Sequence, residues 1–108
     1  MIISASERIP GKKISQHFGL VTGNVVRSKH VGRDIMAFLK NIVGGEIVGY
    51  TEMLSEARDV ALQRMVEQAQ KQGANAVVNV RFNTSSISNM MSEILAYGDA
   101  VVLSPEDA

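Results

Sequence analysis

The pattern of apolar and polar positions predicts one long amphipathic helix between Tyr50 and Gln72. Within this segment apolar side chains recur at steps of three and four residues, which places them along one stripe of a helix. The stripe consists of Tyr50, Met53, Leu54, Ala57, Val60, Ala61, Met65 and Ala69. Such a helix is about 35 Å long, roughly the width of a compact domain of this size, so the rest of the chain is expected to pack on it.

Small and charged residues mark the two ends of this helix. Thr51 or Ser55 is expected to cap the N-terminus with a side-chain oxygen. Lys71 complements the negative end of the helix dipole, and Gly73 can adopt the left-handed conformation that stops a helix.

A strand is expected directly after the helix, with one apolar and one polar face. Its apolar positions are Val78, Val80 and Phe82, and the polar positions between them are Asn79, Arg81 and Asn83. The segment Thr84–Ser92 is rich in serine and asparagine, which is typical of a polar hairpin connection.

The last predicted strand, Glu93–Leu103, is apolar on both faces. Ile94, Ala96, Ala100 and Val102 lie on one face, and Leu95, Tyr97, Val101 and Leu103 lie on the other. A single helix layer covers only one face of a sheet, so another surface must cover the second. In so small a chain a second copy is the natural candidate, and we therefore expect a homo-oligomer.

The N-terminal part of the chain is predicted to be mostly extended. A short strand is expected at Ile2–Ser4, a type II turn at Pro10-Gly11, and extended structure over Ile14–Arg27. Gly23-Asn24 interrupts this last segment either as a bulge or as a two-residue turn, and the two interpretations differ by one strand.

Residues 35–43 repeat with helical spacing and predict a second, shorter helix that ends at Gly44-Gly45. A local basic cluster precedes it, formed by Arg27, Lys29, His30 and Arg33. Because no aromatic residue is interleaved, we interpret this cluster as a solvated connection rather than a phosphate or lipid site. The elements together predict a single α+β domain over residues 1–108, with a two-layer antiparallel sheet packed on one long helix plus a short helix.

Composition excludes several functions. Eleven basic and eleven acidic residues cancel, and aromatic residues make up 5%, so neither nucleic acid nor membrane is an expected partner. No cysteine is present, which excludes disulfides, thiolate metal sites and a cysteine nucleophile. No signal peptide or membrane-spanning stretch is evident, so we expect a cytoplasmic protein.

Motifs for metals, cofactors or catalysis are missing. The chain contains no Gly-x-Ser-x-Gly, His-Glu-x-x-His or Gly-x-Gly-x-x-Gly sequence, and no cofactor is evident. His17 and His30 lack the spacing of a zinc pair, and we interpret each as a surface or hydrogen-bonded residue. Met36, Met53 and Met65 lie on apolar helix stripes, where methionine fills a core.

An ordered set of short motifs resembles the YbjQ family, also called UPF0145. The set consists of Gly44-Gly45-Glu46-Ile47, Tyr50-Thr51, Ala57-Arg58, Arg64-Met65, Gly73-Ala74-Asn75-Ala76-Val77-Val78, Arg81-Phe82, Thr84-Ser85 and Ala96-Tyr97-Gly98. These are small bacterial proteins of unknown function that carry a heavy-metal-binding label. The resemblance implies a dodecin-like α+β subunit that assembles into a ring, and the ring that we expect is a pentamer. Asp99 departs from the family pattern, which has threonine at this position.

Five polar residues inside or beside these motifs are the candidate site: Glu46, Tyr50, Arg58, Arg64 and Arg81. In one interpretation they line a polar pocket, where arginines hold an anionic ligand and Glu46 acts as a base. In the other they pair across subunits and cap helix ends, which we favour because no nucleophile–base pair is implied. The hypothesis that we prefer is a non-enzymatic oligomeric scaffold or small-ligand-binding module. The alternatives are a metal-binding protein and an enzyme with a site between subunits.

Overall fold

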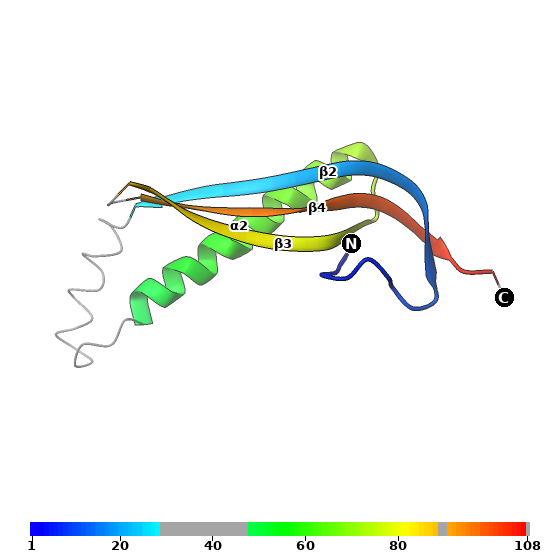
Figure 1. Ribbon diagram of the computed structural model, residues 1–108, viewed down its shortest axis with the longest axis horizontal. Helices are drawn as coiled ribbons and strands as arrows, with labels where there is room; N and C mark the ends of the chain where they lie inside the picture. Colours follow the sequence, from blue (N-terminus) through cyan, green and yellow to red (C-terminus); the bar gives the residue numbers. More distant parts are fainter. Residues whose placement is uncertain (29–47, 89–90, 108) are drawn as a thin grey trace.

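A four-stranded sheet with one long helix on its face makes up the fold. The computed structural model describes residues 1–28, 48–88 and 91–107. The elements in chain order are β1 (Ile2–Ile3), β2 (Lys12–Ser28), α2 (Val48–Gln72), β3 (Ala76–Ser88) and β4 (Met91–Pro105). The strands lie in the order β1-β3-β4-β2, and α2 runs obliquely across one face of the sheet (Figure 1). The predicted α+β class is confirmed.

Two details of the predicted architecture differ from the structure or lie outside it. The sheet is mixed rather than antiparallel throughout, because β1 pairs with β3 in parallel. The predicted short helix lies outside the described residues, as do Lys29, His30 and Arg33 of the basic cluster.

The long helix follows the prediction closely. It ends at Gln72, and Gly73 has a φ of 94°, the left-handed conformation expected after a helix. The prediction of its N-terminal cap is wrong, since α2 extends back to Val48 and both Thr51 and Ser55 lie within it. The sequence signal was ambiguous because serine and threonine cap helices but also occur inside them.

Small side chains let α2 approach the sheet closely. Ala57, Ala61, Met65 and Ala69 are completely buried along its inner stripe. They pack against a core whose members from the sheet are Val21, Val25, Val77, Val80, Ile94, Ala96 and Ala100. Opposite them in β2, Gly23 leaves no room for a side chain, because a Cβ there would overlap the backbone of Ala61 and Met65.

A bulge in β3 overturns the predicted alternation of this strand. Asn79 has a φ of 57°, and the register with β4 shifts between Val78 and Arg81. Val77 and Val80 therefore face α2, while Val78 belongs to a second buried cluster with Ala76, Val101 and Leu103. The prediction that Val78 and Val80 share a face is wrong because one extra residue reverses a period-two pattern.

The strand β2 is continuous through Gly23-Asn24. Both residues pair in register with β4, so neither the bulge nor the turn predicted there is present. The irregularities of β2 lie earlier, between Ile14 and Gln16 and between His17 and Gly19. The turn at Pro10-Gly11 is confirmed: Gly11 has a φ of 79°, and the Lys12 amide donates to the Ile9 carbonyl at 3.1 Å.

The β3–β4 hairpin extends further than its composition indicated. The strand β3 continues to Ser88 and β4 begins at Met91, so most of the predicted connection Thr84–Ser92 is strand. Polar side chains are compatible with this because the backbone groups of β3 pair with β4 whatever the side chains are.

The molecule is elongated. Its radius of gyration is 17.6 Å, whereas a compact domain of this length has about 13 Å. The expectation of a compact domain as wide as its long helix is therefore wrong. No described helix is long and apolar enough to cross a bilayer.

Candidate functional site

Both faces of β4 carry buried apolar side chains, as predicted. Ile94, Ala96 and Ala100 lie in the core beneath α2. On the opposite face Val101 and Leu103 are buried, while Leu95 and Tyr97 are half-buried. The two ends of this second face differ in what covers them.

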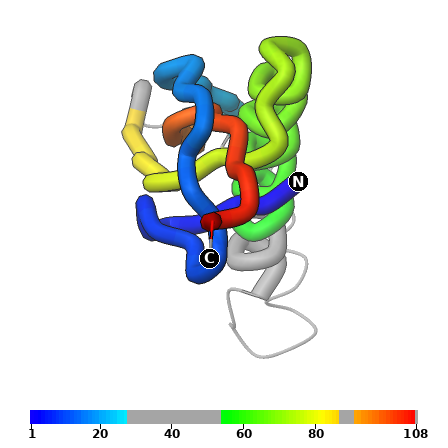
Figure 2. The backbone as a smooth tube through the Cα atoms, turned by 90° about the vertical axis from the view of Figure 1, so that its right-hand side faces the viewer, coloured from blue at the N-terminus to red at the C-terminus, as the bar shows by residue number. Residues whose placement is uncertain are grey.

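At one end the N-terminal segment pairs along the edge of β3 and then packs on the second face. The Ser4 amide donates to the Val77 carbonyl at 3.0 Å, and the Val80 amide donates to the Ser4 carbonyl at 3.0 Å. Ile9 then packs on the second buried cluster. The chain therefore covers part of this face itself, and a second copy remains the expected cover only for the rest. Figure 2 shows this segment, in blue, close to the C-terminal end of the chain, in red.

The other end of the same face carries exposed apolar side chains among the described residues. Leu20 is 66% exposed and Val26 is 41% exposed. Both belong to β2, and their side chains point to the opposite face from those of the buried Val21 and Val25. Their partners in β4 are Asp99 and Glu93. We call this part of the sheet, formed by Leu20, Thr22, Asn24, Val26, Leu95 and Tyr97, the open face.

Side chains of α2 cover the outer edge of β2. The Thr22 amide donates to Oε1 of Gln68 at 2.7 Å, and Nη1 of Arg64 donates to the Asn24 carbonyl at 2.7 Å. These are backbone groups that a neighbouring strand would otherwise bind. The helix therefore satisfies one stretch of an edge strand with side chains instead of another strand.

The structure does not bring the described members of the candidate site together. Arg64 reaches the edge of β2, while Nη1 of Arg81 donates to the carbonyls of Ala5 at 2.7 Å and Val80 at 2.9 Å. Arg58 is exposed on α2. Tyr50 lies in α2 without a described side chain, and Glu46 lies outside the described residues. Both arginines with described partners bind backbone carbonyls of their own chain.

Asp99, which departs from the family pattern, supports the bulge in β3. Its Oδ2 accepts a hydrogen bond from Nδ2 of Asn79 at 3.1 Å. Asparagine is one of the few residues that tolerates a positive φ, and this hydrogen bond holds its side chain. The sequence alone did not indicate this pair, since the two residues lie on different strands.

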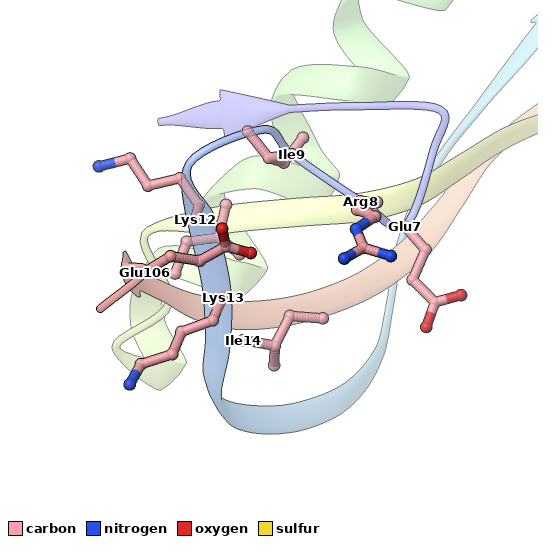
Figure 3. A pocket seen from close by; sticks show the side chains of 8 residues that line it. Glu7, Arg8, Ile9, Lys12, Lys13, Ile14 and Glu106 are labelled. Carbon is pink, nitrogen blue, oxygen red and sulfur yellow. The ribbon is translucent and has the colours of Figure 1, made fainter. Parts of the chain in front are cut away.

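A groove of about 410 Å³ lies where the N-terminal turn meets the end of β4. Its apolar side chains are Ile9, Ile14 and Leu103, and its charged side chains are Glu7, Arg8, Lys12, Lys13 and Glu106. In Figure 3 the guanidinium of Arg8 and the carboxylate of Glu106 lie toward the groove, whereas Glu7 points away. The basic residues on both sides of Pro10-Gly11 were the sequence signal for this groove, which the sequence analysis missed.

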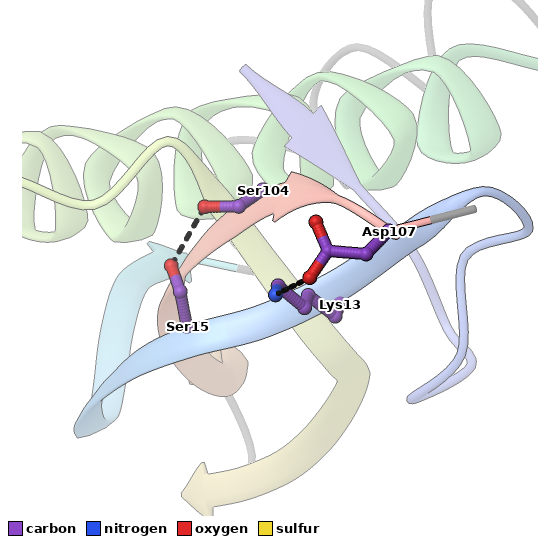
Figure 4. A network of polar contacts seen from close by, with 4 residues as sticks. All are labelled: Lys13, Ser15, Ser104 and Asp107. Atoms are coloured by element: carbon purple, nitrogen blue, oxygen red, sulfur yellow. Dashed lines mark hydrogen bonds and ion pairs between the residues drawn. The ribbon is translucent and has the colours of Figure 1, made fainter.

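The acidic end of the chain is attached beside this groove. The Glu106 amide donates to the Gly11 carbonyl at 3.0 Å, and Asp107 forms an ion pair with Nζ of Lys13 at 3.2 Å. The hydroxyls of Ser15 and Ser104 lie 2.8 Å apart (Figure 4). Ser15 lies within β2, as the expected extended segment Ile14–Arg27 implies, at the register shift between Ile14 and Gln16.

The described residues offer no set of metal ligands. Within residues 1–28, 48–88 and 91–107, no three histidine, aspartate or glutamate side chains converge. His17 is exposed next to the second irregularity of β2, and His30 lies outside the described residues. Soft metals prefer sulfur or imidazole ligands, and this part of the chain provides one histidine and no cysteine.

Comparison with known proteins gives a consistent result along the whole chain. A family model described as "Putative heavy-metal-binding" (YbjQ_1) matches residues 1–104. A UPF0145 protein of Vibrio parahaemolyticus is 64% identical over 103 residues, covering 95% of this chain and 98% of the relative. A UPF0145 protein of Thermosipho melanesiensis is 53% identical over 107 residues, covering 99% of each chain.

A solved structure shares the fold. It is a crystal structure of a Pediococcus pentosaceus protein of unknown function, assigned to the DUF74 family. The TM-score is 0.60 at 14% identity, with 96% of this chain and 98% of the other covered.

Proposed function

This chain belongs to the UPF0145 family, also called YbjQ, and we propose that it is one subunit of a homo-oligomeric ring. The ring acts as a non-enzymatic scaffold or small-ligand-binding module in the cytoplasm, and we expect five subunits. The observation that carries this proposal is the open face of the sheet.

The open face is unusual for a monomer. Leu20 is 66% exposed, and Val26, six residues further along the same face of β2, is 41% exposed. Between them, Tyr97 and Leu95 of β4 pair with Thr22 and Asn24 and are half-buried. Exposed apolar side chains spread over one face of a sheet favour an interface with another protein surface. Burying this apolar surface between copies would stabilise an assembly by about 25 cal/mol for each Å² removed from water.

The two outer edges of the sheet favour a ring over a dimer. On one side β2 is the edge, where Gln68 and Arg64 of α2 bind backbone groups of Thr22 and Asn24, and on the other side β3 pairs with no described strand after Val80. These two edges differ in sequence and in surroundings. An interface between two different surfaces is heterologous, and a heterologous interface that closes on itself generates a cyclic ring.

The elongated shape supports the same proposal. The accessible surface of the chain is 6747 Å², whereas a compact monomer of 11.7 kDa exposes about 5900 Å². A chain with so much surface gains stability when copies of it bury that surface against one another. The metal-binding and enzymatic alternatives gain no comparable support from the described residues.

Native mass spectrometry of the untagged protein, expressed in metal-replete medium, tests the proposal. We expect a discrete ring with the mass of about five bare subunits, stable to dilution. A folded monomer at micromolar concentration would overturn the ring. A reproducible additional mass in the ring would instead identify the class of ligand that the module binds.

A further inference from the structure

The groove between the N-terminal turn and the end of β4 has the chemistry of a binding site. We propose that it binds a small monoanion with an apolar body, of the class of medium-chain carboxylates, and that Glu106 and Asp107 compete with this ligand. The inference deepens the ligand-binding part of the proposed function and rests on it.

The apolar side of the groove can hold the apolar body of such a ligand. Ile14 and Leu103 are direct partners across β2 and β4, and Ile9 packs on the cluster that contains Leu103. Ile14 is still 39% exposed, so apolar surface remains available to a ligand. The volume of about 410 Å³ lies within the range of small-molecule sites, which are lined mostly by apolar groups with a few polar ones.

The charges around the groove select a single negative charge. Of the charged side chains that line the groove, the guanidinium of Arg8 and the carboxylate of Glu106 lie toward it, whereas Glu7 and the amino groups of Lys12 and Lys13 point away (Figure 3). Arg8 forms no ion pair with any described residue, so its guanidinium is available to a carboxylate ligand. A dianion such as phosphate meets stronger repulsion from Glu106 than a monoanion does.

Two carboxylates of the chain itself, those of Glu106 and Asp107, lie beside the groove, where they can compete with a carboxylate ligand. Glu106 is attached through its amide to Gly11, and its carboxylate lies toward the groove on the side of Arg8 (Figure 3). Asp107 binds Lys13, but its side chain is 92% exposed and that of Lys13 is 49% exposed. Exposed ion pairs are weak, so an incoming carboxylate with an apolar body can displace these contacts.

Isothermal titration of the full chain with octanoate tests the proposal, with octan-1-ol and inorganic phosphate as comparison probes. We expect octanoate to bind, and both comparison probes to bind at least tenfold more weakly. Arg8→Gln should weaken octanoate binding about tenfold, since a hydrogen bond to a charged group is lost. The double variant Glu106→Gln/Asp107→Asn should strengthen it, by up to about fivefold.

Lys71→Gln removes one positive charge from the exposed surface of α2, is the control, and should leave octanoate binding unchanged. If Arg8→Gln does not fold, Arg8→Lys serves in its place and should also weaken octanoate binding, because the guanidinium fork is lost. No octanoate binding, equal binding of octan-1-ol, equal binding of phosphate, or equal loss in the Lys71→Gln control would each overturn the inference. Native mass spectra of the same samples separate the two proposals: an intact ring without octanoate binding overturns only the groove, and a monomer that binds octanoate overturns only the ring.

Discussion

Gly23 of β2 lies directly against the carbonyl of Ala61 in α2. A Cβ built on Gly23 would overlap both that oxygen and the amide nitrogen of Met65, and it would stand 3.0 Å from the carbonyl carbon of Arg64. These three atoms belong to the helix backbone, which cannot move aside as a flexible side chain would. The distance between helix and sheet therefore depends on the absence of a side chain at this position.

Gly23→Ala should destabilise the fold by about 1–3 kcal/mol, because the added methyl group forces α2 away from the sheet. Thermal or denaturant unfolding measures the change. Ser85→Ala, an exposed substitution in β3, is the control and should stay within about 0.5 kcal/mol of the native protein. An unchanged stability for Gly23→Ala would show that the helix does not lie this close in solution.

Gln68→Leu should accelerate hydrogen exchange of the Thr22 amide, since the substitution removes the acceptor of that N–H at the edge of β2. Exchange followed by NMR or mass spectrometry gives the rate. Gln63→Leu is the matched control, because Gln63 is exposed on the same helix and its amide contacts only Glu67 among the described residues, at 3.5 Å. If Thr22 remains equally protected in both variants, something other than Gln68 covers this edge, for example a strand of a neighbouring subunit.

Leu20→Lys should dissociate the oligomer into smaller species, because it places a charge at the most exposed apolar position of the open face. Native mass spectrometry or light scattering reports the subunit number. Gln63→Lys adds the same charge on the exposed surface of α2 and should leave the assembly intact. Dissociation by Gln63→Lys alone would place the interface on the helix rather than on the sheet.

Titration with Zn²⁺ should give no stoichiometric, tight binding, since the described residues bring no three ligands together. Elemental analysis of the purified protein, together with calorimetry, provides the measurement. Tight binding that the double variant His17→Ala/His30→Ala abolishes would contradict this prediction and support the heavy-metal description of the family.

The long helix, its end at Gly73 and the turn at Pro10-Gly11 could be predicted from the sequence, because each depends on local spacing or on the backbone preference of one residue. The apolar character of both faces of β4 was also evident, since a strand shows its faces directly in alternate positions. These features need no knowledge of the residues that lie beside them in space.

Other features were decided only by the tertiary structure. The bulge at Asn79 depends on a hydrogen bond from a different strand, through Asp99, and local sequence cannot show it. Gly23 resembled a turn residue, but it is required because a helix backbone lies above it. The sequence left open whether the arginines of the candidate site share a pocket or have structural roles, and the fold shows that Arg64 and Arg81 bind separate backbone carbonyls. The groove brings Arg8 and Glu106 together from opposite ends of the chain, so its composition followed from the path of the backbone.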